Sequence, residues 1–140
     1  MDIYQRNFNR LVKLGIINEK GELQFKEALK IQKKHYMDLN FDYLEKDEQG
    51  DVIAMAHNYI QNGDVMADPD MQIRIIPEMH SIEAMTFQTS NPPIYQQVYP
   101  DPKHVNPKVK KELNSFLEMW LKNLIDQGFK LDQQQAVCEG

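Results

Sequence analysis

One segment near the C-terminus limits the possible folds more than any other. Its apolar residues recur at helical spacing and form one wide stripe: Leu113, Phe116, Leu117, Trp120, Leu121, Leu124 and Ile125. Asn106 can cap the start of this helix, Pro107 suits its first position, and Gly128 suits its end. Such a stripe needs a partner surface to bury it. We therefore predict a helix over residues 107–127 that covers one face of a sheet.

Residues 36–45 predict a strand of that sheet. Apolar and polar residues alternate through this segment, which is the period of a half-buried strand. The alternation places Asp38 and Asp42 on one face and the apolar residues on the other. We therefore expect one face of this strand to be acidic.

The remaining segments complete an α+β pattern. Residues 2–14 have helical apolar spacing with basic residues on the solvent side, whereas residues 22–35 fit either a helix or a strand. Residues 88–106 are rich in proline and predict an extended loop with a short edge strand over residues 95–99. Three more strands are expected, at residues 52–60, 71–76 and 82–87. We predict an antiparallel four- to five-stranded meander packed against an N-terminal helix and a long C-terminal helix.

Length and composition fit one small domain. A chain of 140 residues with 41% apolar residues can bury a core. We expect a single domain over residues 1–131 and a flexible tail over residues 132–140. The segment at the N-terminus lacks the apolar run of a secretory signal, and no run is long enough to span a membrane. With Cys138 as the one cysteine, these features predict a cytoplasmic protein without membrane contact.

The acidic residues gather in the middle of the chain. Residues 37–101 hold twelve acidic side chains and two basic ones, a formal charge of −10, whereas residues 1–36 carry +4 and residues 102–140 carry +1. A one-signed field of this size repels nucleic acid and attracts basic surfaces. We therefore expect a basic protein partner, and a nucleic-acid-binding enzyme is one candidate.

The basic residues gather before the acidic window. Lysines recur between residues 26 and 34, but the stretch lacks the arginine and interleaved aromatic residues of a nucleic-acid surface. Direct binding to nucleic acid is therefore not expected. The basic stretch also fits the acidic middle of a second copy, so a homodimer is a further hypothesis.

Two kinds of residue are candidates for contact with a basic partner. Carboxylates on alternate strand positions lie roughly 7 Å apart and are able to replace phosphates in an Arg/Lys-rich channel. Tyrosines on a proline-stiffened loop suit apolar anchors. The expected partner-binding residues are Asp38, Asp42, Asp64, Asp68, Asp70, Tyr95 and Tyr99. The same acids also fit a solvated sheet surface that charge keeps soluble.

No residue pattern specifies a reaction. The chain has no Gly-x-Ser-x-Gly elbow, no phosphate-binding glycine loop and no histidine pair at metal-ligand spacing. We expect no catalytic residue, no metal and no cofactor. One alternative is a small metal-dependent enzyme that uses Asp64, Asp68 and Asp70 as oxygen ligands together with His57. Another alternative is a structural accessory protein.

Two segments carry a resemblance to known families. The tract Ala56–Met71, followed by Ile94–Tyr99, resembles a family of small uncharacterised bacterial proteins that phages, plasmids and conjugative elements often carry. The resemblance covers roughly residues 36–127, and Leu113–Phe129 is similar to a second uncharacterised proteobacterial family. Both are domains of unknown function, so the resemblance implies a genetic context and no catalytic residue.

Charge and context together lead to a more specific hypothesis. Small acidic proteins on mobile elements resemble, by analogy, inhibitors of host defence such as anti-CRISPR proteins, which block a basic nucleic-acid channel. The sequence therefore predicts a non-enzymatic acidic binding protein, and the specific hypothesis is a mobile-element inhibitor of a nucleic-acid enzyme such as a CRISPR nuclease. It would act by docking an acidic surface on a basic channel.

Overall fold

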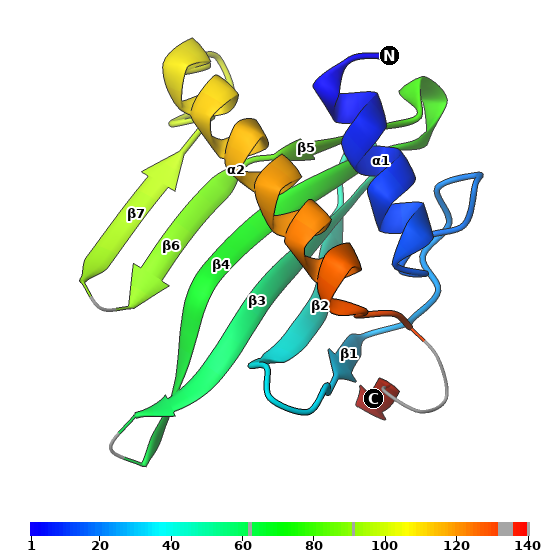
Figure 1. The fold of residues 1–140 in the computed structure, drawn as a ribbon. Coiled ribbons are helices and arrows are strands. Elements are labelled where there is room, and N and C mark those ends of the chain that lie inside the picture. Colours follow the sequence, from blue (N-terminus) through cyan, green and yellow to red (C-terminus); the bar gives the residue numbers. More distant parts are fainter. Residues whose placement is uncertain (62, 91, 132–135, 140) are drawn as a thin grey trace.

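Two helices lie on one face of an antiparallel sheet (Figure 1). The computed structural model describes residues 1–61, 63–90, 92–131 and 136–139. Helix α1 (Ile3–Lys13) precedes the sheet, and the long helix α2 (Pro107–Gln127) follows most of it. The predicted α+β class, with a helix at either end of an antiparallel meander, is confirmed.

The sheet is larger than expected: the described residues form eight strands in place of four or five. The strands are β1 (Ala28–Ile31), β2 (Asp38–Lys46), β3 (Asp51–Gln61), β4 (Asp64–Ile76), β5 (Ser81–Ala84), β6 (Thr86–Ser90), β7 (Pro93–Gln97) and β8 (Ala136–Glu139). Their order across the sheet is β7-β6-β4-β3-β2-β1-β8, and β5 pairs with β4 outside this path. A single 3-10 turn, Pro77–Met79, links β4 to β5.

The extra strands come from segments whose pattern was misleading. The strand expected at 82–87 is split at Met85, whose N–H donates to Gln72 while its carbonyl accepts from Val98. These two bonds point to different neighbours and interrupt the regular pairing there; beyond the break, β6 still pairs with β4 and also pairs with β7. The ambiguous segment 22–35 forms only the short strand β1.

Strand β4 and the C-terminal segment also differ from the expected boundaries. The strand expected at residues 71–76 begins earlier, because Asp68, Pro69 and Asp70 lie inside β4, at an irregularity opposite His57. In the predicted tail 132–140, residues 132–135 and 140 lie outside the described residues. Ala136–Glu139 form β8, which is antiparallel to β1.

The core lies between the sheet and the helices. Alternate residues of β2, β3 and β4 are buried on this side, among them Leu39, Phe41, Ile53, Met55, Met71 and Ile73. They belong to one cluster with Leu117, Trp120 and Leu121 of α2 and with Phe8 and Leu11 of α1. Each fully buried large side chain of this kind contributes about 1.5–3 kcal/mol relative to an exposed one. The predicted apolar stripe of α2 therefore covers the sheet.

Local signals fix both ends of α2 where the sequence placed them. Asn106 Oδ1 accepts a hydrogen bond from the Val109 N–H at 3.2 Å, and Gly128 ends the helix with φ 88°. Glu118 of α2 accepts from Arg6 Nε at 3.0 Å and from Arg10 Nη1 at 2.6 Å, so it ties α2 to α1. Neither of the two described helices is long and apolar enough to cross a membrane.

Candidate binding surface

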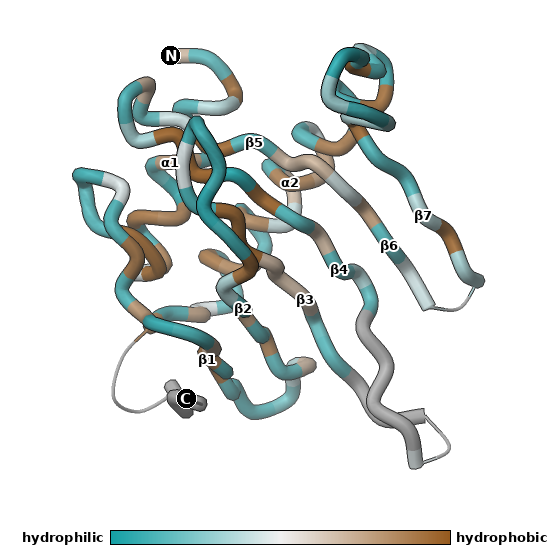
Figure 2. Tube along the Cα trace, turned by 180° about the vertical axis from the view of Figure 1, so that it is seen from behind, coloured by the Kyte–Doolittle hydropathy of each residue, from teal (hydrophilic) through white to brown (hydrophobic). Residues whose placement is uncertain are grey.

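The face of the sheet opposite the helices is open, and we call it the open face. Seen from behind (Figure 2), β2, β3 and β4 lie in front of both helices. Asp38, Asn40 and Asp42 alternate with the buried Leu39 and Phe41, so these three polar side chains belong to the open face. The predicted acidic face of this strand is therefore the face that no helix covers.

Asp70 joins these residues from β4. Pairing across β3 places Asp42 opposite Ala54 and Asp70 opposite Ala56, so two small side chains separate the two carboxylates. Burial, together with the negative charge of Asp42, raises the pKa of Asp70. None of the ion pairs among the described residues involves Asp38, Asp42 or Asp70. On the open face the charge of Asp42 thus disfavours ionisation of Asp70, while Lys30 of β1, which pairs with Asn40, is a basic residue of the same face.

Tyr95 lies in the same transverse row as Asp70. Asp70 pairs with Gln88 of β6, and Gln88 pairs with Tyr95 of β7. Directly paired residues share a face of the sheet, so the Tyr95 side chain stands on the open face, where it is 57% exposed.

The other three predicted residues do not join this group in the same way. Asp68 is half-buried at the irregularity in β4 opposite His57. Asp64 begins β4, and its side chain lies outside the described residues. The hydroxyl of Tyr99 donates to Glu83 Oε2 at 2.6 Å, so this tyrosine belongs to a separate polar cluster.

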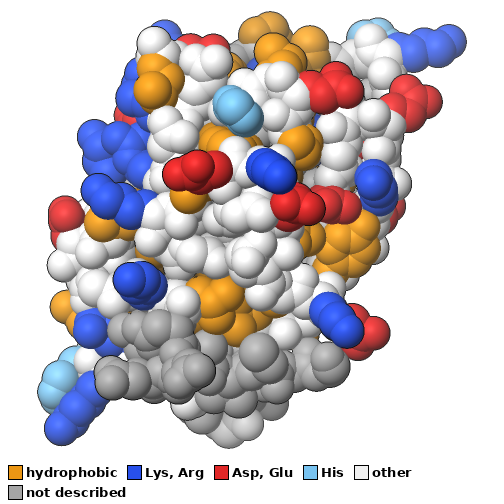
Figure 3. Space-filling model, turned by 90° about the vertical axis from the view of Figure 1, so that its right-hand side faces the viewer, with side chains coloured by type: hydrophobic (Ala, Val, Ile, Leu, Met, Phe, Trp, Pro, Cys, Tyr) orange, Lys and Arg blue, Asp and Glu red, His pale blue; other side chains and the backbone are white. Residues whose placement is uncertain are grey.

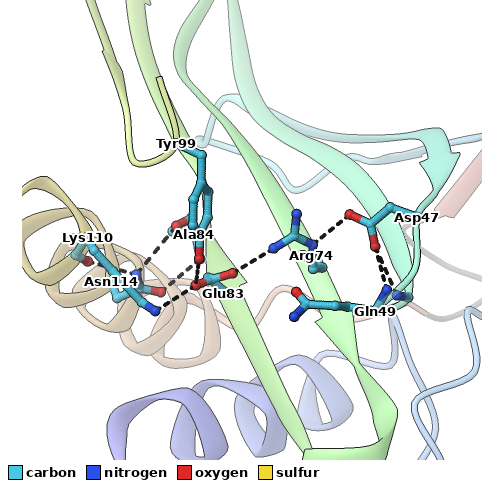
Figure 4. Close-up of polar contacts among 9 residues, drawn as sticks. Asp47, Gln49, Arg74, Glu83, Ala84, Tyr99, Lys110 and Asn114 are labelled. Atoms are coloured by element: carbon cyan, nitrogen blue, oxygen red, sulfur yellow. Dashed lines mark hydrogen bonds and ion pairs between the residues drawn. The ribbon is translucent and has the colours of Figure 1, made fainter. Parts of the chain in front are cut away.

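That polar cluster centres on Glu83 (Figure 4). The Glu83 side chain is 7% exposed, and its Oε1 accepts from Arg74 Nη1 at 3.0 Å. Its Oε2 accepts from Tyr99 and lies 3.0 Å from Lys110 Nζ. Arg74 also donates from Nε to Asp47 Oδ2 at 2.8 Å. We call these five residues the Glu83 clamp, because they join β4, β5, the end of β2, the segment after β7 and α2.

Each charged side chain of the Glu83 clamp already has a partner of opposite charge within the clamp. Burial and the hydrogen bond to Glu83 both raise the pKa of Tyr99. Burial lowers the pKa of Lys110, but the hydrogen bond to Glu83 and the charge of Glu83, together with Tyr99 and Tyr4, raise this pKa overall. Tyr99 and Lys110 therefore both keep their protons at neutral pH, and neither is ready to act as a base. The geometry supports a structural role for this cluster.

A cleft of about 720 Å³ lies beside the clamp. Asp47, Glu48 and Asp101 line it together with Arg74 and Tyr99. Burial raises the pKa of Asp47, but bonds from the Gln49 N–H and from Arg74 outweigh burial and lower it overall. The hydrogen bond from His104, at 2.8 Å, lowers the pKa of Asp101. These two carboxylates are therefore ionised at neutral pH.

The cleft continues the open face. Arg74 follows Asp70 by four residues on β4, which corresponds to about 14 Å along a strand. Asp47 reaches this strand through its bond to Arg74. The cleft thus lies further along β4 than Asp70, with Arg74 between Asp70 and Asp47.

Among the described side chains of the alternative enzyme site, His57 and Asp70 lie on opposite faces of the sheet. His57 is 8% exposed on the helix side of β3, where its ring lies 5.5 Å from that of Trp120 and 5.8 Å from that of Phe129. Burial lowers its pKa, so His57 is neutral at pH 7. Asp70 belongs to the opposite face. In the part of the chain that the structure describes, no three His, Cys, Asp or Glu side chains gather closely enough to hold a metal ion.

Sequence reasoning missed the Glu83 clamp as a unit. The available signal was a lone acid between the apolar residues Ile82 and Ala84, which predicts a buried charge that needs a partner. Acidic and basic residues occupy different stretches of the sequence, but they are less clearly separated on the surface of the folded protein. On the side of the molecule shown in Figure 3, basic and acidic side chains are interspersed with apolar ones.

The fold and this surface define a small α+β protein with a polar, uncovered sheet face. The chain belongs to the family described as Domain of unknown function (DUF6908), whose model matches residues 6–130. No curated protein and no solved structure gives a significant match to the chain.

Proposed function

We propose that this protein is a non-enzymatic binding protein that docks its open face on a basic partner. The observation that carries the proposal is the pair Asp42 and Asp70, which share one face: burial and then the charge of Asp42 raise the pKa of Asp70. A partner's arginine or lysine would relieve this repulsion. The carboxylates of the neighbouring cleft, Asp47 and Asp101, would receive further cations of the same partner.

In its most specific form, the proposal makes the partner a nucleic-acid enzyme with a basic channel, such as a CRISPR nuclease. The protein would then be an inhibitor from a mobile element, with Asp38, Asp42, Asp64, Asp68 and Asp70 in place of phosphates. Tyr95, exposed at the end of the same row, would be an apolar anchor. Tyr99 would act through the shape of the cleft, because its hydroxyl is already bonded to Glu83.

A titration with an arginine-rich decapeptide tests the general form. We expect calorimetry to detect binding at about 50 mM salt that weakens steeply by about 500 mM, because screening removes charge attraction between exposed groups. The double variant Asp42→Asn/Asp70→Asn should bind at least about tenfold more weakly. A matched double variant on α2, Glu112→Gln/Asp126→Asn, changes the net charge equally and should bind as wild type does.

Equal weakening by both double variants would mean that net charge alone, and no particular face, attracts the peptide. The specific form has its own assay: cleavage by an RNA-guided nuclease of the host should slow in the presence of the wild-type protein. The same nuclease should be unaffected by Asp42→Asn/Asp70→Asn. Loss of inhibition in the α2 variant instead would contradict the assignment to the open face.

A further inference from the structure

Within the part of the chain that the structure describes, no strand pairs with the outer edge of β7. β7 lies at one end of the strand order and has β6 as its neighbour there, and four of its five residues are exposed. Ile94 and Tyr95 are 44% and 57% exposed. An edge strand carries backbone N–H and C=O groups that point away from the sheet, so its chemistry fits one more strand.

The hairpin that ends in this edge also lacks charge. Residues 86–99 contain no Asp, Glu, Lys or Arg, although charged residues make up 26% of the chain. Natural edge strands are commonly protected by lysine or by an inward charge, and interface cores are depleted in charge and rich in tyrosine. β7 has the composition of an interface and lacks that protection.

The backbone directions along β7 follow from one hydrogen bond and one proline. Val98 donates its N–H to Met85, on the β6 side. Because successive residues of a strand alternate in direction, the main-chain groups of Gln96 and Ile94 also point to β6. Those of Gln97, Tyr95 and Pro93 point outward. Pro93 has no N–H to offer, and an outward position on an edge strand is where proline is tolerated.

We propose that β7 pairs antiparallel with β7 of a second copy of this chain, about a two-fold axis at Tyr95. Tyr95 and the partner's Tyr95 would exchange two backbone hydrogen bonds. The Gln97 N–H of each copy would donate to the Pro93 carbonyl of the other. Pro93 has no N–H to donate in return, so each Gln97–Pro93 pair makes one backbone hydrogen bond in place of two.

A second copy fits this edge better than a charged partner does. The protein carries a net charge of −5, so two copies approach most easily through surfaces that hold no charge. A two-fold contact of the same strand also closes after two copies, so it produces a dimer and no filament. A five-residue strand is only about 17 Å long, so the contact is small and the dimer should be weak.

The dimer would join the two open faces into one surface, with the Tyr95 side chains at its centre. It differs from the head-to-tail contact expected between the basic stretch 26–34 and the acidic window. It also stands independently of the proposed basic partner. Its dissociation constant should therefore change little between about 50 and 500 mM salt, in contrast to peptide binding by the open face.

Sedimentation velocity on the full chain, from about 1 μM to about 1 mM, measures this association. The variant Gln97→Pro removes an outward N–H and leaves the bonds to β6 in place, and Gln97→Ala is its matched control. We expect Gln97→Pro to weaken the dimer about tenfold or more, because two hydrogen bonds are lost per dimer, and Gln97→Ala to leave it nearly unchanged. Tyr95→Lys, which places like charges together at the axis, should also weaken it.

Oxidative cross-linking tests the register. Paired residues at the axis have Cα atoms about 5.5 Å apart, a distance that suits a disulfide. In a Cys138→Ser background, Tyr95→Cys should therefore cross-link quickly, and Ile94→Cys, which would face Gln96 of the second copy, should cross-link slowly. The proposal is overturned if the wild-type chain stays monomeric over the whole range, or if Gln97→Pro and Tyr95→Lys both leave the dimer unchanged. Should circular dichroism show that Gln97→Pro does not fold, Tyr95→Lys and the cross-linking rates decide.

Discussion

Replacing Glu83 by glutamine tests whether the Glu83 clamp stabilises the fold. Glutamine keeps the shape of the side chain but removes its charge and turns one acceptor into a donor. Three donors converge on this carboxylate, Arg74, Tyr99 and Lys110, at 2.6–3.0 Å. A hydrogen bond to a charged group contributes about 1.5–3 kcal/mol, and removing one partner of a buried ion pair costs about 3–5 kcal/mol.

Solvent reduces the expected loss. The Lys110 side chain is 33% exposed, so its share is screened, and Arg74 retains its bond to Asp47. We therefore expect Glu83→Gln to lower the free energy of unfolding by about 3 kcal/mol. Urea unfolding at neutral pH, followed by circular dichroism and by the fluorescence of Trp120, gives the value.

A double-mutant cycle separates the clamp from its surroundings. Tyr99→Phe should cost about 1.5 kcal/mol alone and much less in the Glu83→Gln background, because the two residues share one hydrogen bond. The exposed Glu78→Gln is the control for charge and should change stability by less than about 0.5 kcal/mol. A loss below about 1 kcal/mol for Glu83→Gln, or strict additivity with Tyr99→Phe, would refute this reasoning.

Three further predictions concern the open face, one turn and one helix cap. The pKa of Asp70 is raised in the folded state, so the free energy of unfolding falls as pH rises past the unfolded pKa of this group. Thermal unfolding should therefore show Asp70→Asn to be more stable than wild type at pH 7, by up to about 1 kcal/mol. The two proteins should not differ in stability at low pH. In Gly50→Ala the new Cβ would overlap the Ile75 carbonyl oxygen, so urea denaturation should show a free energy of unfolding lower by at least about 2 kcal/mol. Gly63 has a φ of 85° but open space around it, so Gly63→Ala should lower this free energy by about 1 kcal/mol. Asn106→Ala removes the cap of α2 and should cost about 1 kcal/mol by the same measurement.

Features set by neighbours in the sequence could be predicted. Asn106, Pro107 and Gly128 act within one turn of the helix that they bound, so both ends of α2 were correct. The period-2 alternation of residues 36–45 placed Asp38 and Asp42 on one face for the same reason, since a strand needs no distant partner to fix which residues share a side.

Features set by distant contacts could not be predicted. The break between β5 and β6 depends on bonds from Met85 to Gln72 and Val98, which no local pattern encodes. The sequence predicts Arg6 and Arg10 to face solvent on an amphipathic helix, yet both donate to Glu118, which lies more than a hundred residues later in the chain. The pattern of one sequence indicates whether a segment alternates as a strand or a helix does, whereas the strand or side chain that it pairs with is set by the assembled fold.

Only part of the candidate binding surface could be predicted from the sequence. Asp70 joins Asp42 only because the pairing register across β3 brings them to neighbouring rows, and an irregularity in that register leaves Asp68 apart. Tyr95 and Tyr99 looked alike as loop tyrosines. The structure separates them, because Tyr95 stands on the sheet and Tyr99 bonds to Glu83, whose position the sequence did not reveal.

The most direct test of the account is to map the contact of a cationic partner by amide chemical shifts. An arginine-rich decapeptide added to the ¹⁵N-labelled protein at about 50 mM salt is the probe. The account predicts the largest changes in residues 38–42, 54–56 and 70–74, on the open face. Changes confined to the amides of α1 and α2, on the other side of the sheet, would contradict it.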